Sequence, residues 1–502
     1  MQVPFVPKIP HKKRVILVKK AIFLRTLSLA VSFFIGVSAC FGAETLMDQA
    51  RQAVTDYRVR TTELADWCEK NGLLREAKLT RDQLLPSAED RIYVPTFPKE
   101  IVSESVPEDS PELVQKWNAD RWKIKKEYAA ELQRLLNRAV RQKQSVLAMQ
   151  MAIAALHADP NHERLRNILG LKNYKNQWRT NWEIRMLKQG NLEHERFGWL
   201  PAKYVKRYEN GERFYRGKWM PEEEEAKIRS GLQTGWKIES EHYTIATNHS
   251  LEEGVRLSRE LEDFYRAWLQ VFILFHASDD EFSAMFQGRP SVREANLRVV
   301  YYKNQEDYIK ANVNAHPHIG ITGGYFDLEK ECCFFFHTDD PEVHKTVFHE
   351  ATHQLFTCSG KFPKNARSSC NFWITEAVAV YMESFHKENG YCVLGGYNQE
   401  RLQMARYRYF ETKFYVPFAL LVRFDIARFQ SFPHVGLPLP KDWTLAMLYS
   451  QMGGMGHFFM HAEGGKYREL FVEYLLQVYS GRDTVLTLFE LSRTVPERLD
   501  EA

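Results

Sequence analysis

The feature that most constrains the fold of this chain is a pair of histidines four residues apart, in the stretch His349-Glu350-Ala351-Thr352-His353. On an α-helix, residues four apart lie one turn apart on the same face. Both imidazoles can therefore reach one metal ion, at about 2.0–2.1 Å each. Glu350 lies beside them, where its carboxylate is placed to take a proton from a water on that ion. The spacing predicts a helix that carries two metal ligands and a general base.

The flanking residues predict the same helix independently. Asp339 and Asp340 are good N-caps, and Pro341 suits the first helical position. Apolar or small residues recur at i, i+3, i+4 and i+7, namely Phe348, Ala351, Thr352 and Leu355. This stripe predicts that one face of the helix is buried next to the histidines.

A third ligand is predicted at Glu376, 23 residues after His353. Glu376 lies in a second helical pattern, residues 373–383, and the interval allows a loop and an antiparallel helix to bring its carboxylate to the same ion. Ala377 and Ala379 are small enough to let the two helices approach closely. A purely structural pair of helices is the alternative interpretation.

His-Glu-x-x-His followed by Trp-Ile-Thr-Glu at 373–376 resembles the gluzincin metallopeptidases, and most closely the peptidase-MA-like group of secreted bacterial proteins. The resemblance covers residues 235–502. It implies one Zn²⁺ per chain, held by His349, His353 and Glu376. It also implies hydrolysis of a peptide bond by water that the zinc and Glu350 activate, with a peptide or protein as substrate.

The same resemblance implies a hydrogen-bond donor for the oxyanion that forms on the attacked carbonyl. In gluzincin aminopeptidases this donor is a tyrosine that opens a helix some seventy residues after the zinc glutamate. Tyr449 lies 73 residues after Glu376 and is the first candidate, and His457 is the second. A packed tyrosine and a core histidine are the structural alternatives.

Residues 235–502 also predict a small sheet. Strands are expected over 236–247 and 297–302, a long helix over 251–272, and a hairpin of 322–326 with 331–336 just before the histidine helix. By the resemblance, Glu331–Phe336 or the glycines before it would line the cleft beside an extended substrate, although 331–336 could equally be a core strand.

The sequence says less about which bond is cut. The Gly-x-Met-Glu-Asn motif of gluzincin aminopeptidases is absent, and Gly323-Gly324-Tyr325-Phe326 stands where it is sought. This difference favours an endopeptidase over an aminopeptidase. The alternative function is an exported helical-repeat binding or scaffold protein whose metallopeptidase-like domain is catalytically silent.

With 502 residues, two or three domains are expected, and the overall class is α+β. Residues 40–170 predict a helical region, either a plain bundle or stacked units of tetratricopeptide type, with a spacer near 86–111 that is poor in strands. Residues 171–234 predict a duplicated module, because Tyr174, Trp178, Glu183 and Gly190 recur 41 positions later. The metallopeptidase-like domain is expected to follow at 235–502.

The N-terminus predicts export. Seven basic residues precede Glu44, the first acidic residue, and an apolar run over 26–39 ends in Val37-Ser38-Ala39-Cys40. This pattern is typical of a signal peptide spanning 1–39. The signal peptide could be cleaved after Ala39, or Cys40 could be lipidated; an uncleaved N-terminal anchor is the alternative. In each case the protein is expected in the periplasm, the envelope or the medium.

Charge and cysteines narrow the function classes further. Without the seven basic residues of the leader, the net charge of +4 becomes about −3, so nothing in the charge indicates nucleic-acid binding. A disulfide between Cys358 and Cys370 is a hypothesis, since these residues flank the loop between the two helices. Cys332 and Cys333 are expected on opposite faces of a strand. The absence of Cys-x-x-Cys excludes the common thiolate zinc and redox motifs.

Overall fold

The computed structural model describes residues 45–289, 296–360, 362–363, 369–436 and 438–501, and it confirms the α+β class. The predicted leader and Cys40 lie outside these residues. From Ala50 onward the described residues form one compact unit, and the candidate site lies in it. Within the described part of the chain, no helix combines the length and the apolar character needed to span a membrane.

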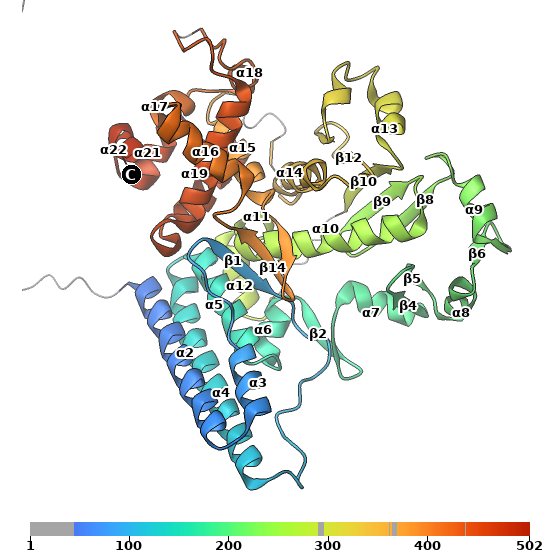
Figure 1. The fold of residues 1–502 in the computed structure, drawn as a ribbon, viewed down its shortest axis with the longest axis vertical. Helices are drawn as coiled ribbons and strands as arrows, with labels where there is room; N and C mark the ends of the chain where they lie inside the picture. The colour runs from blue at the N-terminus through green and yellow to red at the C-terminus, as the bar shows by residue number, and fades with distance from the viewer. Residues whose placement is uncertain (1–44, 290–295, 361, 364–368, 437, 502) are drawn as a thin grey trace, which may run out of the picture. The chain divides into compact units, whose positions relative to one another are not determined.

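The N-terminal region is a helical bundle, coloured blue to cyan in Figure 1. Its helices are α2 Leu46–Lys70, α3 Leu74–Asp82, α4 Glu112–Arg141, α5 Ser145–Ala158 and α6 Glu163–Ile168. Tyr57 of α2 and Tyr128 of α4 stack with their ring centroids 4.1 Å apart. Helix α5 is buried nearly all round, because it packs against α4 and also against α10 (Leu251–Val271), α11 (Ile273–His276) and α20 (Arg468–Tyr479). The bundle therefore shares its core with the rest of the unit.

The spacer after α3 contributes a strand to a distant sheet. Strand β1 (Arg91–Pro95) pairs antiparallel with β14 (Tyr391–Gly395), which pairs in turn with β13 (His386–Glu388). The sequence predicts few strands in this spacer, because a strand paired with a partner some 300 positions away has no local signal. The N-terminal region is thereby tied to the part of the chain that follows the two predicted metal helices.

The predicted duplication is a threefold repeat of a β-hairpin followed by a short helix. The copies are β2 Leu171–Tyr174, β3 Gln177–Thr180 and α7 Asn181–Lys188; β4 Asn191–His194, β5 Gly198–Pro201, the 3-10 turn η1 Ala202–Tyr204 and α8 Val205–Glu209; and β6 Glu212–Tyr215, β7 Lys218–Pro221 and α9 Glu222–Ile228. Trp178, Trp199 and Trp219 mark the period. The middle copy is hard to recognise in the sequence, because its hairpin turn is one residue longer and His194 stands where the other two copies have a tyrosine.

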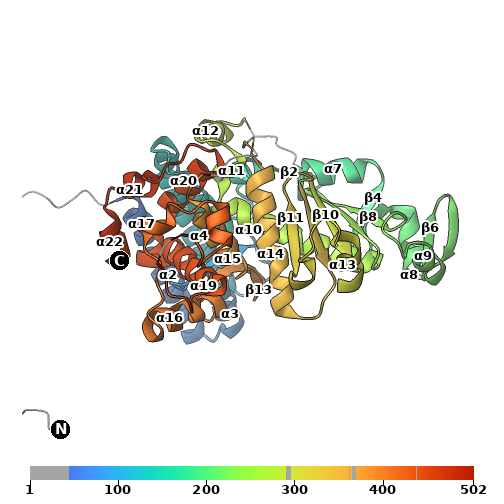
Figure 2. The ribbon, with the colours of Figure 1, turned by 90° about the horizontal axis from the view of Figure 1, so that it is seen from above.

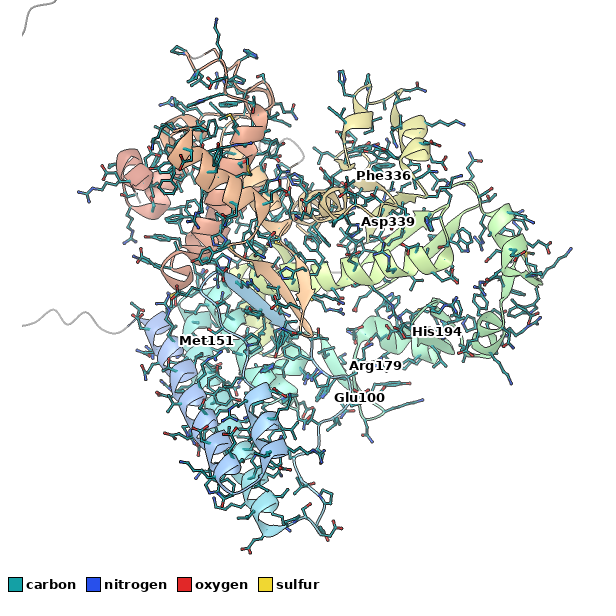
Figure 3. The ribbon with its side chains drawn as sticks, viewed as in Figure 1. Glu100, Met151, Arg179, His194, Phe336 and Asp339 are labelled. Atoms are coloured by element: carbon teal, nitrogen blue, oxygen red, sulfur yellow. The ribbon has the colours of Figure 1, made fainter. Side chains whose placement is uncertain are left out.

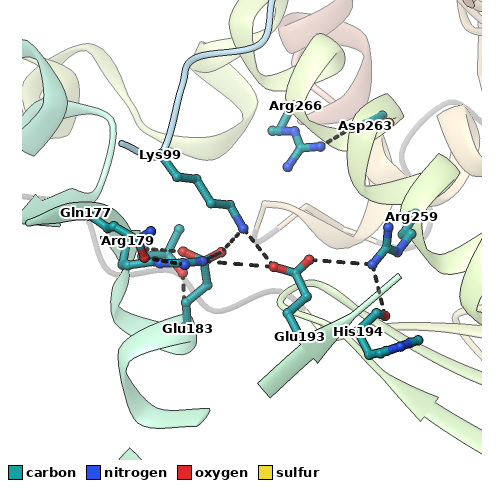
Figure 4. A network of polar contacts seen from close by, with 10 residues as sticks. Lys99, Gln177, Arg179, Glu183, Glu193, His194, Arg259, Asp263 and Arg266 are labelled. Atoms are coloured by element: carbon teal, nitrogen blue, oxygen red, sulfur yellow. Dashed lines mark hydrogen bonds and ion pairs between the residues drawn. The ribbon is translucent and has the colours of Figure 1, made fainter. Parts of the chain in front are cut away.

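Ion pairs fix this module to its neighbours (Figure 4). The Nζ atom of Lys99, in the spacer, lies 2.7 Å from Oε1 of Glu183 and 2.8 Å from Oε2 of Glu193. Arg259 of α10 lies 3.9 Å from the other carboxylate oxygen of Glu193. Two glutamates of the first two copies are thus held by cations from two other parts of the unit, so these copies are docked and do not hang as a free linker.

A five-stranded sheet of order β11-β12-β10-β9-β8 follows the repeats. Its strands are β8 Trp236–Glu239, β9 Tyr243–Thr247, β10 Leu297–Tyr302, β11 Gly324–Asp327 and β12 Cys332–Phe336. The single strand predicted over 236–247 is in fact the hairpin β8–β9. The alternation of buried residues shifts by one between the two strands: even-numbered residues such as Ile238 are buried in β8, and odd-numbered residues such as Tyr243 are buried in β9. In the turn between them, Oε1 of Glu262 accepts the backbone N–H of His242 at 2.8 Å. The other predicted strands and the predicted hairpin are confirmed.

Strand β12 is an interior strand, parallel to β10 and antiparallel to β11. All its residues are buried, so of the two interpretations of 331–336 the core strand is correct, and β11, with Gly324, forms the edge. Cys332 and Cys333 face different hydrophobic clusters on the two sides of the sheet, as predicted. Helix α10 packs on β8 and β9, and α13 (Gln305–Asn312) packs on β10 and β12 and contacts η2 (Ile319–Ile321), whereas α12 (Asp279–Phe286) contacts α4.

The C-terminal part is helical. Its helices are α14 Pro341–Cys358, α15 Phe372–Met382, α16 Glu400–Glu411, α17 Phe418–Leu421, α18 Ile426–Gln430, α19 Leu445–Gly465, α20, α21 Thr487–Ser492 and α22 Pro496–Glu501. Figure 2 shows α14 alongside the sheet, with α15 and α19 beyond it. Gly456 of α19 allows the close approach of this helix to α15, since a Cβ atom added at Gly456 would lie 2.5 Å from the Ala377 carbonyl oxygen. Phe336 and Asp339, labelled in Figure 3, lie where β12 leads into α14.

A hydrogen bond to Glu469 of α20 helps to attach the helical bundle to the C-terminal part of the chain. Its Oε1 atom accepts the backbone N–H of Leu147 at 2.8 Å, in the first turn of α5. Burial raises the pKa of Glu469 from 4.5 to about 7, and the charge of Asp279 adds to the rise. The Glu469 carboxyl therefore stays protonated to higher pH in the folded protein than in the unfolded chain. As a result, Glu469 makes the free energy of unfolding fall as the pH rises from about 4.5 to about 7.

We expect Glu469→Gln, which keeps an acceptor for Leu147 but cannot ionise, to match the wild type near pH 5. Near pH 8 it should be more stable, by on the order of 1 kcal/mol. Denaturant unfolding at both pH values measures the difference. Glu473→Gln, on the same helix, is the matched control and should keep the wild-type pH dependence. An unchanged pH dependence in Glu469→Gln would contradict the assignment.

Candidate metal centre

Helix α14 presents the two histidines because of how it begins and which face it buries. The carboxylate of Asp340 caps the helix by accepting the backbone N–H of Glu342 at 2.9 Å, and Pro341 takes the first helical position. Of the two predicted caps, Asp340 is thus the one used. The predicted stripe of Phe348, Ala351, Thr352 and Leu355 is buried, as expected. The histidine face is therefore turned away from this core, toward α15.

The structure brings His349, His353 and Glu376 together. The Nε2 atoms of the two histidines lie 3.3 Å apart. Oε2 of Glu376 lies 3.4 Å from Nε2 of His349, and Oε1 lies 3.6 Å from Nε2 of His353. The side chains are only 7–15% exposed. This cluster is the one group of three or more His, Cys, Asp or Glu in the described residues with the geometry to hold a metal ion.

The electrostatics of the cluster show how closely its members are coupled. Burial raises the pKa of Glu376, but the two histidines outweigh burial, so the net shift is downward. For His349, burial lowers the pKa, but bonds to the carboxylates of Glu376 and Glu383 outweigh it and raise the pKa well above its ordinary value. Oε2 of Glu376 is buried and makes no hydrogen bond of normal geometry. A cation among these three groups would satisfy the buried carboxylate.

Glu383, which is not among the site residues predicted from the sequence, orients His349. Its Oε1 atom lies 2.8 Å from Nδ1 of His349, so the other ring nitrogen, Nε2, points at the cluster. Its Oε2 atom accepts a hydrogen bond from Nε of Arg401 at 3.3 Å. Carboxylates commonly fix ligand histidines in this way. The sequence signal was available: Glu383 follows Glu376 by seven residues, which is two turns along the same helix.

Glu350 faces the cluster from the sheet side. Its Oε2 atom accepts the backbone N–H of Phe326 in β11 at 2.9 Å. Burial raises the pKa of Glu350 to about 7, the charge of His349 opposes this rise and that of Glu376 adds to it. Because the N–H of Phe326 points to Glu350, it is not used in pairing with β12. The unpaired edge of β11 therefore faces the cluster.

Tyr449 lies beside the cluster and His457 does not. The ring centroid of Tyr449 is 6.4 Å from that of His349. Burial raises the pKa of Tyr449 well above its ordinary value, and the nearby Glu376 carboxylate adds to the rise. His457 follows two turns later on α19, and its ring contacts Tyr397 and His461, with centroids 5.4 and 4.5 Å away. The first candidate for the oxyanion donor is thus adjacent to the predicted metal ligands, whereas the second lies about 12 Å further along its helix.

The hypothetical disulfide between Cys358 and Cys370 is not formed, since both cysteines are free. The Cys370 thiol instead donates to Oδ2 of Asp483 at 3.3 Å. Asn371 holds the start of α15: its Nδ2 donates to Asp483 at 2.7 Å, and its Oδ1 accepts from the Tyr474 hydroxyl at 2.5 Å. Buried hydrogen bonds from the C-terminal helices therefore position Glu376, in place of a cross-link.

We expect Glu383→Gln to lower the affinity of the cluster for Zn²⁺ by roughly 10- to 100-fold, because the amide holds the His349 ring less firmly and adds no charge. Competition with a chromogenic chelator at fixed pH measures this affinity. Glu411→Gln, an exposed glutamate at the end of α16, is the matched control and should bind as the wild type does. Equal affinities for all three proteins would contradict the role of Glu383.

Comparison with known proteins does not assign a function to this cluster. No model of a known protein family matches the chain. No curated protein matches it either. The chemistry of the site must therefore be judged from its own residues.

Proposed function

We propose that this protein is an exported, zinc-dependent peptide-bond hydrolase of gluzincin type. The observation that carries the proposal is the convergence of His349, His353 and Glu376: the two Nε2 atoms lie 3.3 Å apart, and the two carboxylate oxygens of Glu376 face one histidine each, Oε2 at 3.4 Å from His349 and Oε1 at 3.6 Å from His353. A tetrahedral zinc ion with bonds of about 2.0–2.2 Å separates its ligand atoms by about 3.3–3.6 Å. Two imidazoles and one carboxylate are also a donor set typical of catalytic zinc sites.

Three further features support the fit of zinc. The buried Oε2 atom of Glu376 lacks a hydrogen-bond partner of normal geometry, as expected of a group meant for a cation. Glu383 fixes the ring of His349 so that Nε2 is directed at the cluster. All three ligands belong to α14 and α15, which are regular helices, so the donor atoms are held in place before any ion binds.

A zinc ion held by His349, His353 and Glu376 would supply Lewis acidity and lower the pKa of a water molecule at the site. Glu350 is the base: it removes the proton from the attacking water and delivers it to the leaving amine. The backbone N–H of Phe326 holds one oxygen of Glu350, which leaves the other for the proton. Tyr449 donates its hydroxyl hydrogen to the oxyanion on the attacked carbonyl.

The edge strand β11 is the surface for the substrate backbone. It is the last strand of the sheet and runs past Glu350, whose carboxylate accepts the outward N–H of Phe326. An extended peptide can add to the remaining edge groups through main-chain hydrogen bonds. Such binding does not require a free chain end. Together with the absence of the aminopeptidase motif, this favours an endopeptidase.

Glu350→Gln tests the assignment of the base. We expect this variant to bind one Zn²⁺ per chain with near wild-type affinity but to hydrolyse a broad peptide library at least about 100-fold more slowly, since general base catalysis contributes about 10²–10⁴-fold. Chelation of the wild type should abolish cleavage, and added Zn²⁺ should restore it. A variant that cleaves as fast as the parent would contradict the role of Glu350. A folded wild type that binds no zinc would contradict the proposal itself.

Tyr449→Phe tests the oxyanion donor. Loss of one such donor typically costs about 10²–10³-fold in kcat, so we expect a decrease of this size with little change in KM and none in zinc content. Tyr415→Phe is a control at a tyrosine whose hydroxyl bonds Asp500, and it should retain kcat. An unchanged kcat in Tyr449→Phe would indicate that this tyrosine only packs against Phe429, its ring neighbour on α18.

A further inference from the structure

A pocket of about 240 Å³ opens beside the metal centre, between α14, α15, α16 and α19. The residues of its wall that matter here are Glu342, Lys345 and Thr346 of α14, Glu383 at the end of α15, and Glu400 and Arg401 of α16. Glu383 belongs to both the pocket and the metal centre, because its other contact is His349. The pocket is therefore separated from the metal ligands by a single side chain.

The pocket also borders the path expected for a substrate along β11. Thr346 precedes Glu350 by four residues, about one helical turn or 6 Å along α14. A Cβ atom added at Gly323 would lie 2.6 Å from Oγ1 of Thr346, so the chain enters β11 in direct contact with this wall. A peptide extended along β11 past Glu350 would thus place a side chain near the scissile bond at the pocket mouth.

Two of the three carboxylates in the wall are already paired with cations. Glu383 binds both His349 and Arg401, at 2.8 and 3.3 Å. Oε1 of Glu342 lies 2.6 Å from Nζ of Lys345. Glu400 is exposed at the rim and is hydrogen-bonded to Glu342. The other two carboxylates each have a cationic partner, which leaves Glu400, in contact with solvent, as the carboxylate of this wall without one within the described ranges.

Arg401 has hydrogen-bonding capacity to spare. Its side chain is 47% exposed, and Nε is the one guanidinium nitrogen with a protein partner among the described residues. Arg401 is close enough to the active centre to oppose the rise in the pKa of Tyr449 caused by burial and by Glu376. The close packing of α16 on α19 holds its backbone, because a Cβ atom added at Gly453 would lie 2.8 Å from Cβ of Arg401. Its two Nη atoms form the planar fork that binds a carboxylate through two hydrogen bonds.

We propose that this pocket is a specificity subsite for an acidic side chain, Asp or Glu, next to the scissile bond of the substrate, and that Arg401 recognises the carboxylate. The inference rests on the proposed peptidase function and adds the substrate class. Lys345 is already paired with Glu342, so the preference for an anion over a neutral side chain of the same size comes from the two Nη atoms of Arg401, whose Nε alone is bonded to Glu383.

Paired peptides that differ only by Glu and Gln at each position around the cleavage site test the subsite, with the zinc-loaded full chain. We expect the wild type to prefer Glu at one position by about tenfold or more in kcat/KM, since charge-assisted bidentate pairs are among the strong hydrogen bonds. In Arg401→Gln the ratio of the Glu to the Gln peptide should fall to near one. Arg401→Lys, which keeps the charge but not the fork, should give an intermediate ratio.

Arg406→Gln is the matched control, because Arg406 is an exposed arginine of the same helix outside the pocket, and it should keep the wild-type ratio. Zinc content and thermal unfolding of each variant show whether the ratio changes in a folded, loaded protein. A wild-type ratio near one at every position, or a ratio that Arg401→Gln leaves unchanged, would overturn the subsite.

A binding measurement separates this inference from the proposed function. Calorimetry with the same peptides and the zinc-loaded Glu350→Gln protein should show tighter binding of the Glu peptide, and the preference should disappear in the double variant with Arg401→Gln. Such a preference without any cleavage by the wild type would support the subsite and overturn the hydrolase. Cleavage without a Glu preference would leave the hydrolase standing and overturn the subsite.

Discussion

The arrangement depends on the convergence of α14 and α15, which brings two imidazoles and one carboxylate within 3.3–3.6 Å of one another in a nearly buried position. Such a cluster is costly without a counter-charge, because burial disfavours the ionised carboxylate and the charged imidazoles. Its members offset this cost through mutual hydrogen bonds and through Glu383, and Arg401 in turn neutralises Glu383. A cation at the centre would complete the balance of charge.

The rest of the fold keeps those two helices in place. Asn371, bonded to Asp483 and Tyr474, fixes the start of α15, while Gly456 lets α19 pack against its middle. The sheet positions α14 on its other side, and the backbone of β11 holds Glu350. The N-terminal bundle contributes as well, since β1 completes the sheet that contains β14 and α5 is buried against α20. Chain segments hundreds of residues apart therefore stabilise a site made by two helices.

The proposed peptidase and the acidic subsite follow from the same geometry. Glu383 directs His349 at the cluster on one side and receives Arg401 on the other. Recognition of a substrate carboxylate by Arg401 would thus occur one side chain away from the metal ligands. This proximity gives a physical route by which binding energy from a neighbouring side chain of the substrate can help to position the scissile bond.

The sequence alone predicted the helix of His349 and His353, the carboxylate of Glu376 beside them and the α+β class, because helical spacing, capping and apolar periodicity are local signals. Tyr449 was predicted only through the resemblance to gluzincins. Tertiary structure decided what has no local signal. The pairing of β1 with β14, the Asn371 contacts in place of a disulfide and the contact of Arg401 with Glu383 all depend on partners brought together by packing. Side chains that recognise one another across distant segments leave no regular spacing in the sequence, so their contacts emerge only when the chain is folded.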